Sequence, residues 1–233
     1  MLSIIVPTLN EEKHIPNLLN CLKNQTYKNF EIIVVDAHSN DKTKEVVKKF
    51  KNLKIKIINS EKRNVAYQRN IGVKYANNER ILFLDADTKI PKDFLENALK
   101  EIKNNEISAC RTYPDSSHPI DIFFIFLFRI YLKALYKLIG FNGCCLFSLK
   151  SVHNKINGFD ETIKVSEDFD YTKRIKKFAK LHLLKKPYIK ISMRRFEKNG
   201  RIRTGLKILV IGIYIDFGGR IRNNLFNYKF NEK

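Results

Sequence analysis

The sequence predicts an α/β fold in which a mostly parallel central sheet is flanked by helices. Between residues 1 and 110, short runs rich in β-branched residues alternate with segments of helical periodicity. Alternation of this kind favours parallel strands with helices on both faces of the sheet. Polar clusters directly follow three of the expected strands, at the edge where such folds bind ligands. With 233 residues, 44% of them hydrophobic, the chain can bury one substantial core.

The first half of the chain supplies the expected strands and the helices between them. The strands are apolar runs at residues 2–6, 31–35, 54–58 and 80–84. The helical segments have polar or proline starts and occupy residues 11–23, 41–51, 64–77 and 91–103. After residue 110 come apolar segments at 120–141 and 206–217, an acidic cluster at 166–170 and a basic run at 194–203. We expect this second half to complete the sheet and to build the site of a second substrate.

The net charge and the cysteine content limit which classes of function fit this chain. Lys and Arg number 44 against 24 for Asp and Glu, so the net charge of +20 attracts polyanions such as nucleotides, nucleic acid or anionic lipid headgroups. Charge alone does not choose among them. The four cysteines have no C-x-x-C spacing, which favours a reducing cytoplasm over a zinc site or a disulfide framework. The amino-terminal apolar run has no basic residues before it and indicates a buried strand rather than a signal peptide.

Two of the polar clusters carry carboxylates at strand ends. Asp85 and Asp87 follow an apolar run directly, and Mg²⁺ typically takes one or two carboxylates together with substrate phosphates. In isolation, such a pair is more often a solvated turn. Asp36 follows the run at 31–35 at the equivalent strand-end position, where it could accept hydrogen bonds from a base N–H or from ribose hydroxyls. Alternatively, Asp36 is an acid at a helix start that Ser39 or Asn40 caps.

Together these motifs resemble family 2 glycosyltransferases, which have the GT-A fold. The matching pieces run in the family's order over residues 1–175, and they are residues 4–11, 34–36 with 39–41, 69–72 with 84–87, 158–161 and 167–168. The resemblance implies a Rossmann-like GT-A domain over 1–205, with a nucleotide-sugar-binding half at 1–110 and an acceptor-binding half at 111–205. The remaining residues, 206–233, would form a C-terminal apolar helix that associates with a membrane.

The resemblance also implies roles for individual residues on the donor side. Pro7, Thr8 and Glu11 would border the base and ribose, and Asp36 would recognise the base. Arg69 would lie near the diphosphate, although exposed arginines are commonly solvated helix charges. Asp85 would lie near the ribose, and the metal ligands would be Asp85 and Asp87, with Mg²⁺ or Mn²⁺ as the cofactor.

On the acceptor side, the resemblance implies that Asp168 is the catalytic base. It would take the proton of the acceptor hydroxyl as that oxygen attacks the anomeric carbon, so that the sugar is transferred with inversion. The alternative for Asp168 is an acid in the first turn of a helix, where the dipole favours it. Arg194 and Arg195 would reach the diphosphate from a mobile loop, and the alternative for them is a basic surface patch.

The apolar segment at 120–139 predicts contact with a membrane surface. It contains Asp121, Arg129, Lys133 and Lys137, so it falls short of the roughly 20 clean apolar residues that a span needs. The three bases share one helical face beside an aromatic-rich apolar face, as in helices that lie among anionic headgroups. We therefore expect a cytoplasmic enzyme, peripheral at the inner face of the cell membrane, whose acceptor is a lipid phosphate or a lipid-linked glycan. Core packing of this segment and of 206–217 is the alternative.

Two other classes compete with a nucleotide-sugar transferase. A sugar-nucleotide pyrophosphorylase would need a glycine-rich loop after the first strand, and residues 7–11 contain no glycine. A basic module that binds nucleic acid fits the net charge, but in the first half the basic residues are dispersed among acids and form no recognised binding motif. His38 and residues 111–119 depart from the family pattern, so base and sugar stay open.

Overall fold

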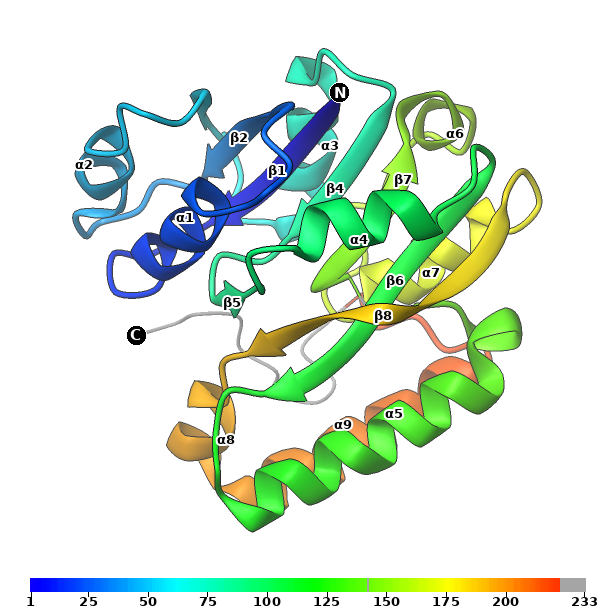
Figure 1. The fold of residues 1–233 in the computed structure, drawn as a ribbon. Helices are drawn as coiled ribbons and strands as arrows, with labels where there is room; N and C mark the ends of the chain where they lie inside the picture. The colour runs from blue at the N-terminus through cyan, green and yellow to red at the C-terminus, as the bar shows by residue number, and fades with distance from the viewer. Residues whose placement is uncertain (142, 223–233) are drawn as a thin grey trace.

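A computed structural model describes residues 1–141 and 143–222, which form one mixed α/β structure (Figure 1). Eight strands of this described part make a single sheet in the order β3-β2-β1-β4-β7-β6-β8-β5. The first four in sequence are parallel, and their bounds are β1 Leu2–Thr8, β2 Phe30–Asp36, β3 Ile55–Asn59 and β4 Arg80–Leu84. All four lie within two residues of the predicted runs. Thr8 pairs with Asp36 across β1 and β2, so their carboxyl ends meet at one edge.

The helices of the first half also lie where the periodicity predicts them. They are α1 Ile15–Lys23, α2 Thr43–Lys48, α3 Val65–Tyr75 and α4 Phe94–Glu101. The Asn64 side chain caps α3 by accepting from the Tyr67 amide at 2.9 Å. Alternate residues of β1 belong to different cores, since Ile4 packs with α1 and Ile5 with α3. Both faces of the sheet are therefore covered, which explains why its strands read as continuous apolar runs.

The second half extends the sheet with mixed pairing. Its strands are β5 Thr88–Lys89, β6 Glu106–Pro114, β7 Cys145–Leu149 and β8 Lys180–Ile191. Strand β7 is antiparallel to both β4 and β6, whereas β6 and β8 are parallel. Short helices follow several of these strands: α6 Lys150–Lys155, α7 Glu167–Ile175 and α8 Arg194–Asn199. Because β7 is antiparallel to β4, the start of β7 at Cys145 lies beside Leu84 at the end of β4.

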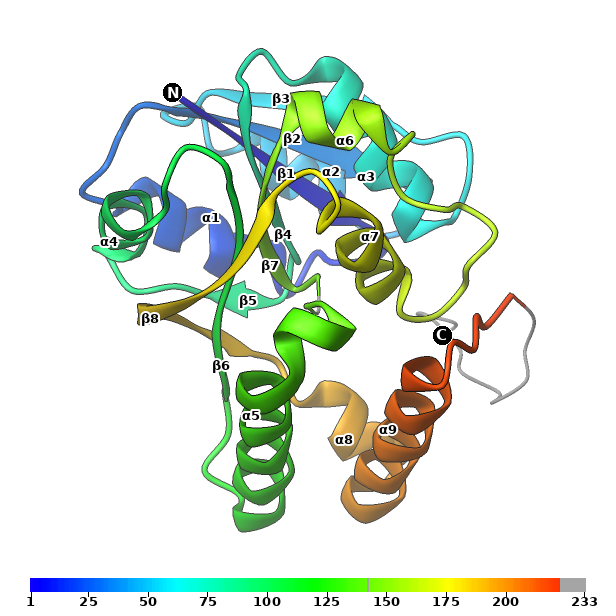
Figure 2. The ribbon, with the colours of Figure 1, turned by 90° about the vertical axis from the view of Figure 1, so that its right-hand side faces the viewer.

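Two longer helices, α5 Pro119–Ile139 and α9 Arg201–Asp216, run alongside each other away from the main body of the sheet (Figure 2). Arg201 Nε lies 3.0 Å from the buried Asp121 Oδ1 at one end, and Tyr131 hydrogen-bonds Asp216 at the other. In the described part of the chain, no helix is long and apolar enough to cross a membrane. The expected boundary between 205 and 206 falls inside α9 and stays a prediction.

Candidate active site

The carboxyl ends of β1 and β2 enclose Asp36. This fully buried carboxylate accepts from Thr8 Oγ1 at 3.1 Å, from Ser39 Oγ at 2.5 Å and from the Ser39 amide at 3.0 Å. Beneath it, the buried Gln68 side chain donates to the carbonyls of Thr8 and Val35 at 2.9 and 2.6 Å, which ties α3 to both strands. These hydrogen bonds therefore fix the Asp36 carboxylate at the carboxyl end of β2.

The loops after β1 and β2 lock together through backbone-to-side-chain hydrogen bonds. The Asn10 amide donates to Ser39 Oγ at 2.9 Å, and the Glu11 amide donates to Thr43 Oγ1 at 2.8 Å. Asn10 and His38 adopt positive φ angles of 56° and 54°, in the left-handed region that non-glycine residues rarely enter. The shared hydrogen bonds therefore hold the two loops in one arrangement at the edge of the sheet.

A buried arginine joins the end of β4 to the start of α7. Arg69, whose side chain is 3% exposed, places Nη1 2.6 Å from Glu167 Oε1 and Nη2 3.0 Å from Asp85 Oδ1. It also donates to the Gly143 carbonyl at 3.3 Å. Asp168 accepts from the backbone amides of Gly143 and Phe169. A Cβ on Gly143 would lie 2.8 Å from the Asp168 Cβ and 2.9 Å from Arg69 Nη1, so only glycine fits here without a shift.

A second arginine joins the loop after β1 to the loop after β4. Arg194, at the start of α8, donates from both Nη atoms to the two Glu11 carboxylate oxygens at 2.9 and 2.6 Å. Its Nη2 also lies 3.3 Å from Asp87 Oδ2. Carboxylates from three separate loops thus gather at one rim, where two arginines hold them.

Burial sets the protonation behaviour of these acids. Burial raises the pKa of Asp85, which Arg69 counteracts, and raises that of Asp87, which Arg194 counteracts. The pKa of Glu167 rises to about 7, first because the carboxyl is buried and then because Asp168 is close. Burial also raises the pKa of Asp168, against the opposing effect of Arg69. For Arg195, burial lowers the pKa, while Asp87 and Asp85 oppose that change. Added positive charge would stabilise the ionised carboxylates here.

The donor set fits a hard divalent cation that phosphates help to bind. Asp85 and Asp87 offer carboxylate oxygens two residues apart, and such a cation accepts one or two carboxylates with phosphate oxygens completing its shell. Over residues 1–141 and 143–222, no three His, Cys, Asp or Glu side chains group closely enough to hold a metal ion by themselves. A cation at this rim would therefore depend on a phosphate-bearing ligand.

The predicted site residues fall into two connected groups, and their roles stay predictions. Thr8, Asp36 and the buried Pro7 lie at the ends of β1 and β2, and Glu11 links them to Arg194. The second group, around the end of β4, holds the remaining candidates Arg69, Asp85, Asp87, Asp168 and Arg195.

Sequence reasoning gave no separate role to three residues that organise this rim, namely Gln68, Gly143 and Glu167. Glu167 lay inside the acidic cluster already noted, whereas Gly143 lay outside every motif named above. Gln68, in the middle of a helix, carried no signal.

The fold and the family follow from comparison with known proteins. The mannosyltransferase PcManGT from Pyrobaculum calidifontis, solved with GDP-Man and Mn²⁺, superposes with a TM-score of 0.70 at 19% identity, covering 95% of this chain and 65% of that one. The architecture is that of GT-A glycosyltransferases. Residues 3–157 match the model of glycosyl transferase family 2, so the chain belongs to that family.

Relatives of known activity are similar over less than half of the chain. The poly(ribitol-phosphate) β-N-acetylglucosaminyltransferase TarS of Staphylococcus aureus is 40% identical over 101 residues, which are 41% of this chain and 18% of TarS. WfgD of Escherichia coli, a UDP-Glc:α-D-GlcNAc-diphosphoundecaprenol β-1,3-glucosyltransferase, is 35% identical over 109 residues, which are 46% of this chain and 43% of WfgD. The chain thus matches less than half the length of each.

Proposed function

We propose that this chain is an inverting glycosyltransferase that moves a sugar from a nucleotide-diphosphate sugar to an acceptor hydroxyl or phosphate, with Mg²⁺ or Mn²⁺ as cofactor. One observation carries the proposal. Arg69 and Arg194 bring acids from the ends of β1 and β4 and from the start of α7 to a single rim. A solvated D-x-D turn would need no such buried counter-ions, because water would screen its charges.

The nucleotide would bind at the ends of β1 and β2. The Asp36 Oδ1 atom already accepts from Thr8 and Ser39, whereas Oδ2 accepts one hydrogen bond, from the Ser39 amide. A carboxylate oxygen has two acceptor sites, so Oδ2 can take a further hydrogen bond from a base N–H. Pro7 and Glu11 would border the base and ribose from the neighbouring strand end.

The diphosphate would bind beside Asp85 and Asp87. These carboxylates would hold the divalent cation, which neutralises charge on the leaving nucleotide when it is bound. Arg194 lies 3.3 Å from Asp87, and Arg195 is close enough for Asp87 and Asp85 to influence its pKa, so both would supply charge-assisted hydrogen bonds to phosphate oxygens. Arg69 is committed to Glu167 and Asp85, so it would act by fixing Asp85 close to the diphosphate.

Asp168 would be the general base. Its carboxylate is oriented by the amides of Gly143 and Phe169, and burial raises its pKa from the ordinary range of an aspartate. A raised pKa makes the ionised carboxylate a better proton acceptor. It would take the acceptor proton as the acceptor oxygen attacks from the face opposite the leaving diphosphate, and the configuration at the anomeric carbon would invert.

Thermal stabilisation tests this assignment. A panel of UDP, GDP, ADP and CDP, each with and without Mn²⁺, should contain one nucleotide that raises the melting temperature, and Mn²⁺ should enhance that rise. Asp87→Asn should lose the enhancement by Mn²⁺. Asp168→Asn should keep it but lose turnover of the matching sugar nucleotide. If none of these nucleotides raises the melting temperature, with or without Mn²⁺, the proposal is refuted.

We further propose that the α5–α9 face binds the inner surface of an anionic membrane and that the acceptor is lipid-linked. The exposed apolar side chains of this face are Ile122, Phe123, Phe126, Ile130, Leu135 and Leu138 from α5 and Ile202, Leu206, Leu209, Val210, Ile213, Tyr214 and Phe217 from α9 and its end. This many exposed apolar side chains on two adjacent helices favours an interaction site. WfgD, whose acceptor is a diphosphoundecaprenol, offers a precedent in the family.

Of the three basic residues that the sequence placed on one face of α5, Lys133 and Lys137 are exposed but Arg129 is only partly so. Lys133 and Lys137 are exposed within the same arc as Phe126 and Ile130, whereas the Arg129 guanidinium lies 4.1 Å from the Tyr113 ring centroid and is half-buried. The helix buries its other side against β6 and α9, so charged and apolar residues share one outward arc. Mixed basic and apolar residues on that arc favour an anionic bilayer over a neutral protein surface.

Vesicle flotation tests the membrane proposal. The protein should float with vesicles containing phosphatidylglycerol, and less so with phosphatidylcholine alone or at high salt. Leu206→Asp with Val210→Asp should abolish flotation. Phe178→Asp, which alters an exposed aromatic residue away from this face, should leave it unchanged. Self-association in light scattering without flotation would show that the face binds a second copy and would overturn the proposal.

A further inference from the structure

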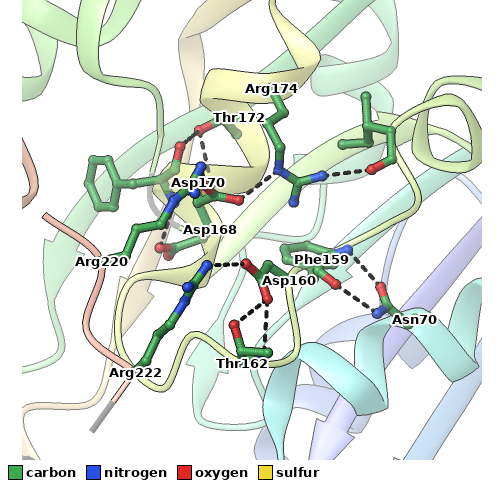
Figure 3. Close-up of polar contacts among 12 residues, drawn as sticks. Asn70, Phe159, Asp160, Thr162, Asp168, Asp170, Thr172, Arg174, Arg220 and Arg222 are labelled. Carbon is green, nitrogen blue, oxygen red and sulfur yellow. Dashed lines mark hydrogen bonds and ion pairs between the residues drawn. The ribbon is translucent and has the colours of Figure 1, made fainter. Parts of the chain in front are cut away.

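The residues that follow α9 cross over the loop that leads to Asp168. We call residues 218–222 the strap. Arg220 donates from Nε and Nη2 to Asp170 Oδ1 at 3.0 and 2.9 Å, and Arg222 Nη2 lies 3.3 Å from Asp160 Oδ2 (Figure 3). Between these two arginines, Ile221 forms an antiparallel bridge with Val165. The strap therefore contacts the loop through Ile221 and Arg222 and contacts α7 itself through Arg220.

The loop between α6 and α7 is anchored differently in its two halves. Apart from the Arg222–Asp160 ion pair, its first half is tied to α3. Asn70 exchanges two hydrogen bonds with the Phe159 backbone, at 2.8 and 3.0 Å, and Asn64 donates to the Glu161 carbonyl at 2.9 Å. Its second half, residues 163–166, is tied to the strap through the Lys164 amide, which donates to the Ile221 carbonyl at 2.8 Å. Only this second half leads directly into Glu167 and Asp168.

The second half of the loop needs such an anchor. Ser166 immediately precedes Glu167 and adopts a positive φ of 61°, and its side chain makes no capping hydrogen bond to α7. A non-glycine residue in this conformation persists only when its surroundings hold it there. Those surroundings include a small apolar cluster of Val165 with Ile211, Ile215 and Ile221. The strap and α9 thus supply the packing on which the entry to α7 rests.

We propose that Arg220 and Arg222 are positioning residues, which hold loop 163–166 through the strap and so place Asp168 for proton transfer. This inference rests on the proposed function, in which Asp168 is the base. Arg220 and Arg222 act only through Asp170, Asp160 and the bridge. Displacement of a reacting group by about 1 Å can cost on the order of 100-fold in rate, so a partly exposed anchor can matter more for turnover than for folding.

Paired substitutions and hydrogen exchange test the strap. Arg220→Gln with Arg222→Gln should speed amide exchange in residues 163–170 and lower kcat for the sugar nucleotide about tenfold or more. The KM for that donor, the stabilisation by its nucleotide with Mn²⁺ and the melting temperature should stay close to wild type. Arg220→Lys with Arg222→Lys should restore much of the kcat, because the charges remain. Arg203→Gln removes an exposed charge from α9 outside the strap and is the matched control.

The outcomes separate the strap from the assignment on which it rests. Unchanged exchange in residues 163–170, or unchanged kcat in a protein that still binds its nucleotide, would overturn the strap alone. An equal fall in donor binding and turnover would show general damage and would also overturn it. If no nucleoside diphosphate stabilises even the wild-type protein, the proposed function fails, and the role of the strap in proton transfer fails with it.

Discussion

Replacing Arg69 by methionine should unfold the protein more easily at neutral pH than at acid pH. The substitution keeps much of the apolar volume but leaves Glu167, which is 5% exposed, without its counter-ion. Removing one partner of a buried ion pair costs about 3–5 kcal/mol. Asp85 is 35% exposed and water can partly screen it, so we place the loss at about 3 kcal/mol. For a chain of this length that corresponds to about 6–12 °C in melting temperature.

The pH dependence follows from the Glu167 carboxyl. Its folded pKa of about 7 lies above the ordinary value of 4.5, so the stability this group contributes is present below pH 4.5 and is lost as the pH rises through 7. Without Arg69 the folded pKa should rise further, so the variant should lose most at pH 8 and least at pH 5.

Thermal melts across this pH range measure the difference. Arg69→Met with Glu167→Gln should recover part of the loss, and Lys100→Met, which breaks an exposed pair with Glu96, should cost little at any pH. An Arg69→Met deficit that is equal at pH 5 and pH 8 would contradict the reasoning.

Two further predictions concern single carboxylates. Asp36→Asn replaces an acceptor-only carboxylate by an amide, so affinity for the preferred nucleotide, measured by calorimetry, should fall about tenfold or more. The enhancement of binding by Mn²⁺ should persist. Unchanged affinity would show that Asp36 does not recognise the base. Because burial raises the pKa of Asp168, the acid limb of the pH profile of kcat should lie above the pKa range of an ordinary aspartate. Turnover should fall as the pH drops through that limb. An acid limb in the ordinary range would argue against Asp168 as the base.

The first half of the fold was predictable because its signals are local. Strands β1, β2 and β4 are largely buried on both faces, so each appears as a continuous apolar run, whereas the edge strand β3 is only partly buried. The strand ends carry the polar residues, and the topology of parallel strands brings those ends together. Asp36, Asp85 and Asp87 could therefore be placed at one edge before any coordinates were known.

The second half was less predictable because its organisation depends on distant pairings. Strand β8 carries four exposed lysines without a regular alternation and pairs with β6 across some 70 intervening residues, so neither strand was assigned from the sequence. The same holds for the site, where Arg69 and Glu167 are 98 residues apart. Nothing in the local pattern distinguishes an arginine that will be buried in an ion pair from one that is solvated on a helix.

Arg194 pairs with acidic groups that a divalent cation would also require. Its removal should therefore raise the affinity for free Mn²⁺ and lower the affinity for the nucleotide. It pairs with both oxygens of Glu11 and lies 3.3 Å from Asp87 Oδ2, so in the protein alone it competes with a cation for the Asp87 carboxylate. Arg194→Gln should therefore bind Mn²⁺ more tightly without nucleotide.

The same variant should bind the nucleotide with Mn²⁺ about tenfold more weakly, because it loses a charge-assisted hydrogen bond to phosphate. Titration of free Mn²⁺ followed by paramagnetic resonance gives the first quantity, and calorimetry with the nucleotide gives the second. Arg63→Gln, which removes an exposed arginine near His38, controls for the change in net charge. If both affinities fell together, Arg194 would be supporting the architecture of the rim rather than exchanging one anionic partner for another.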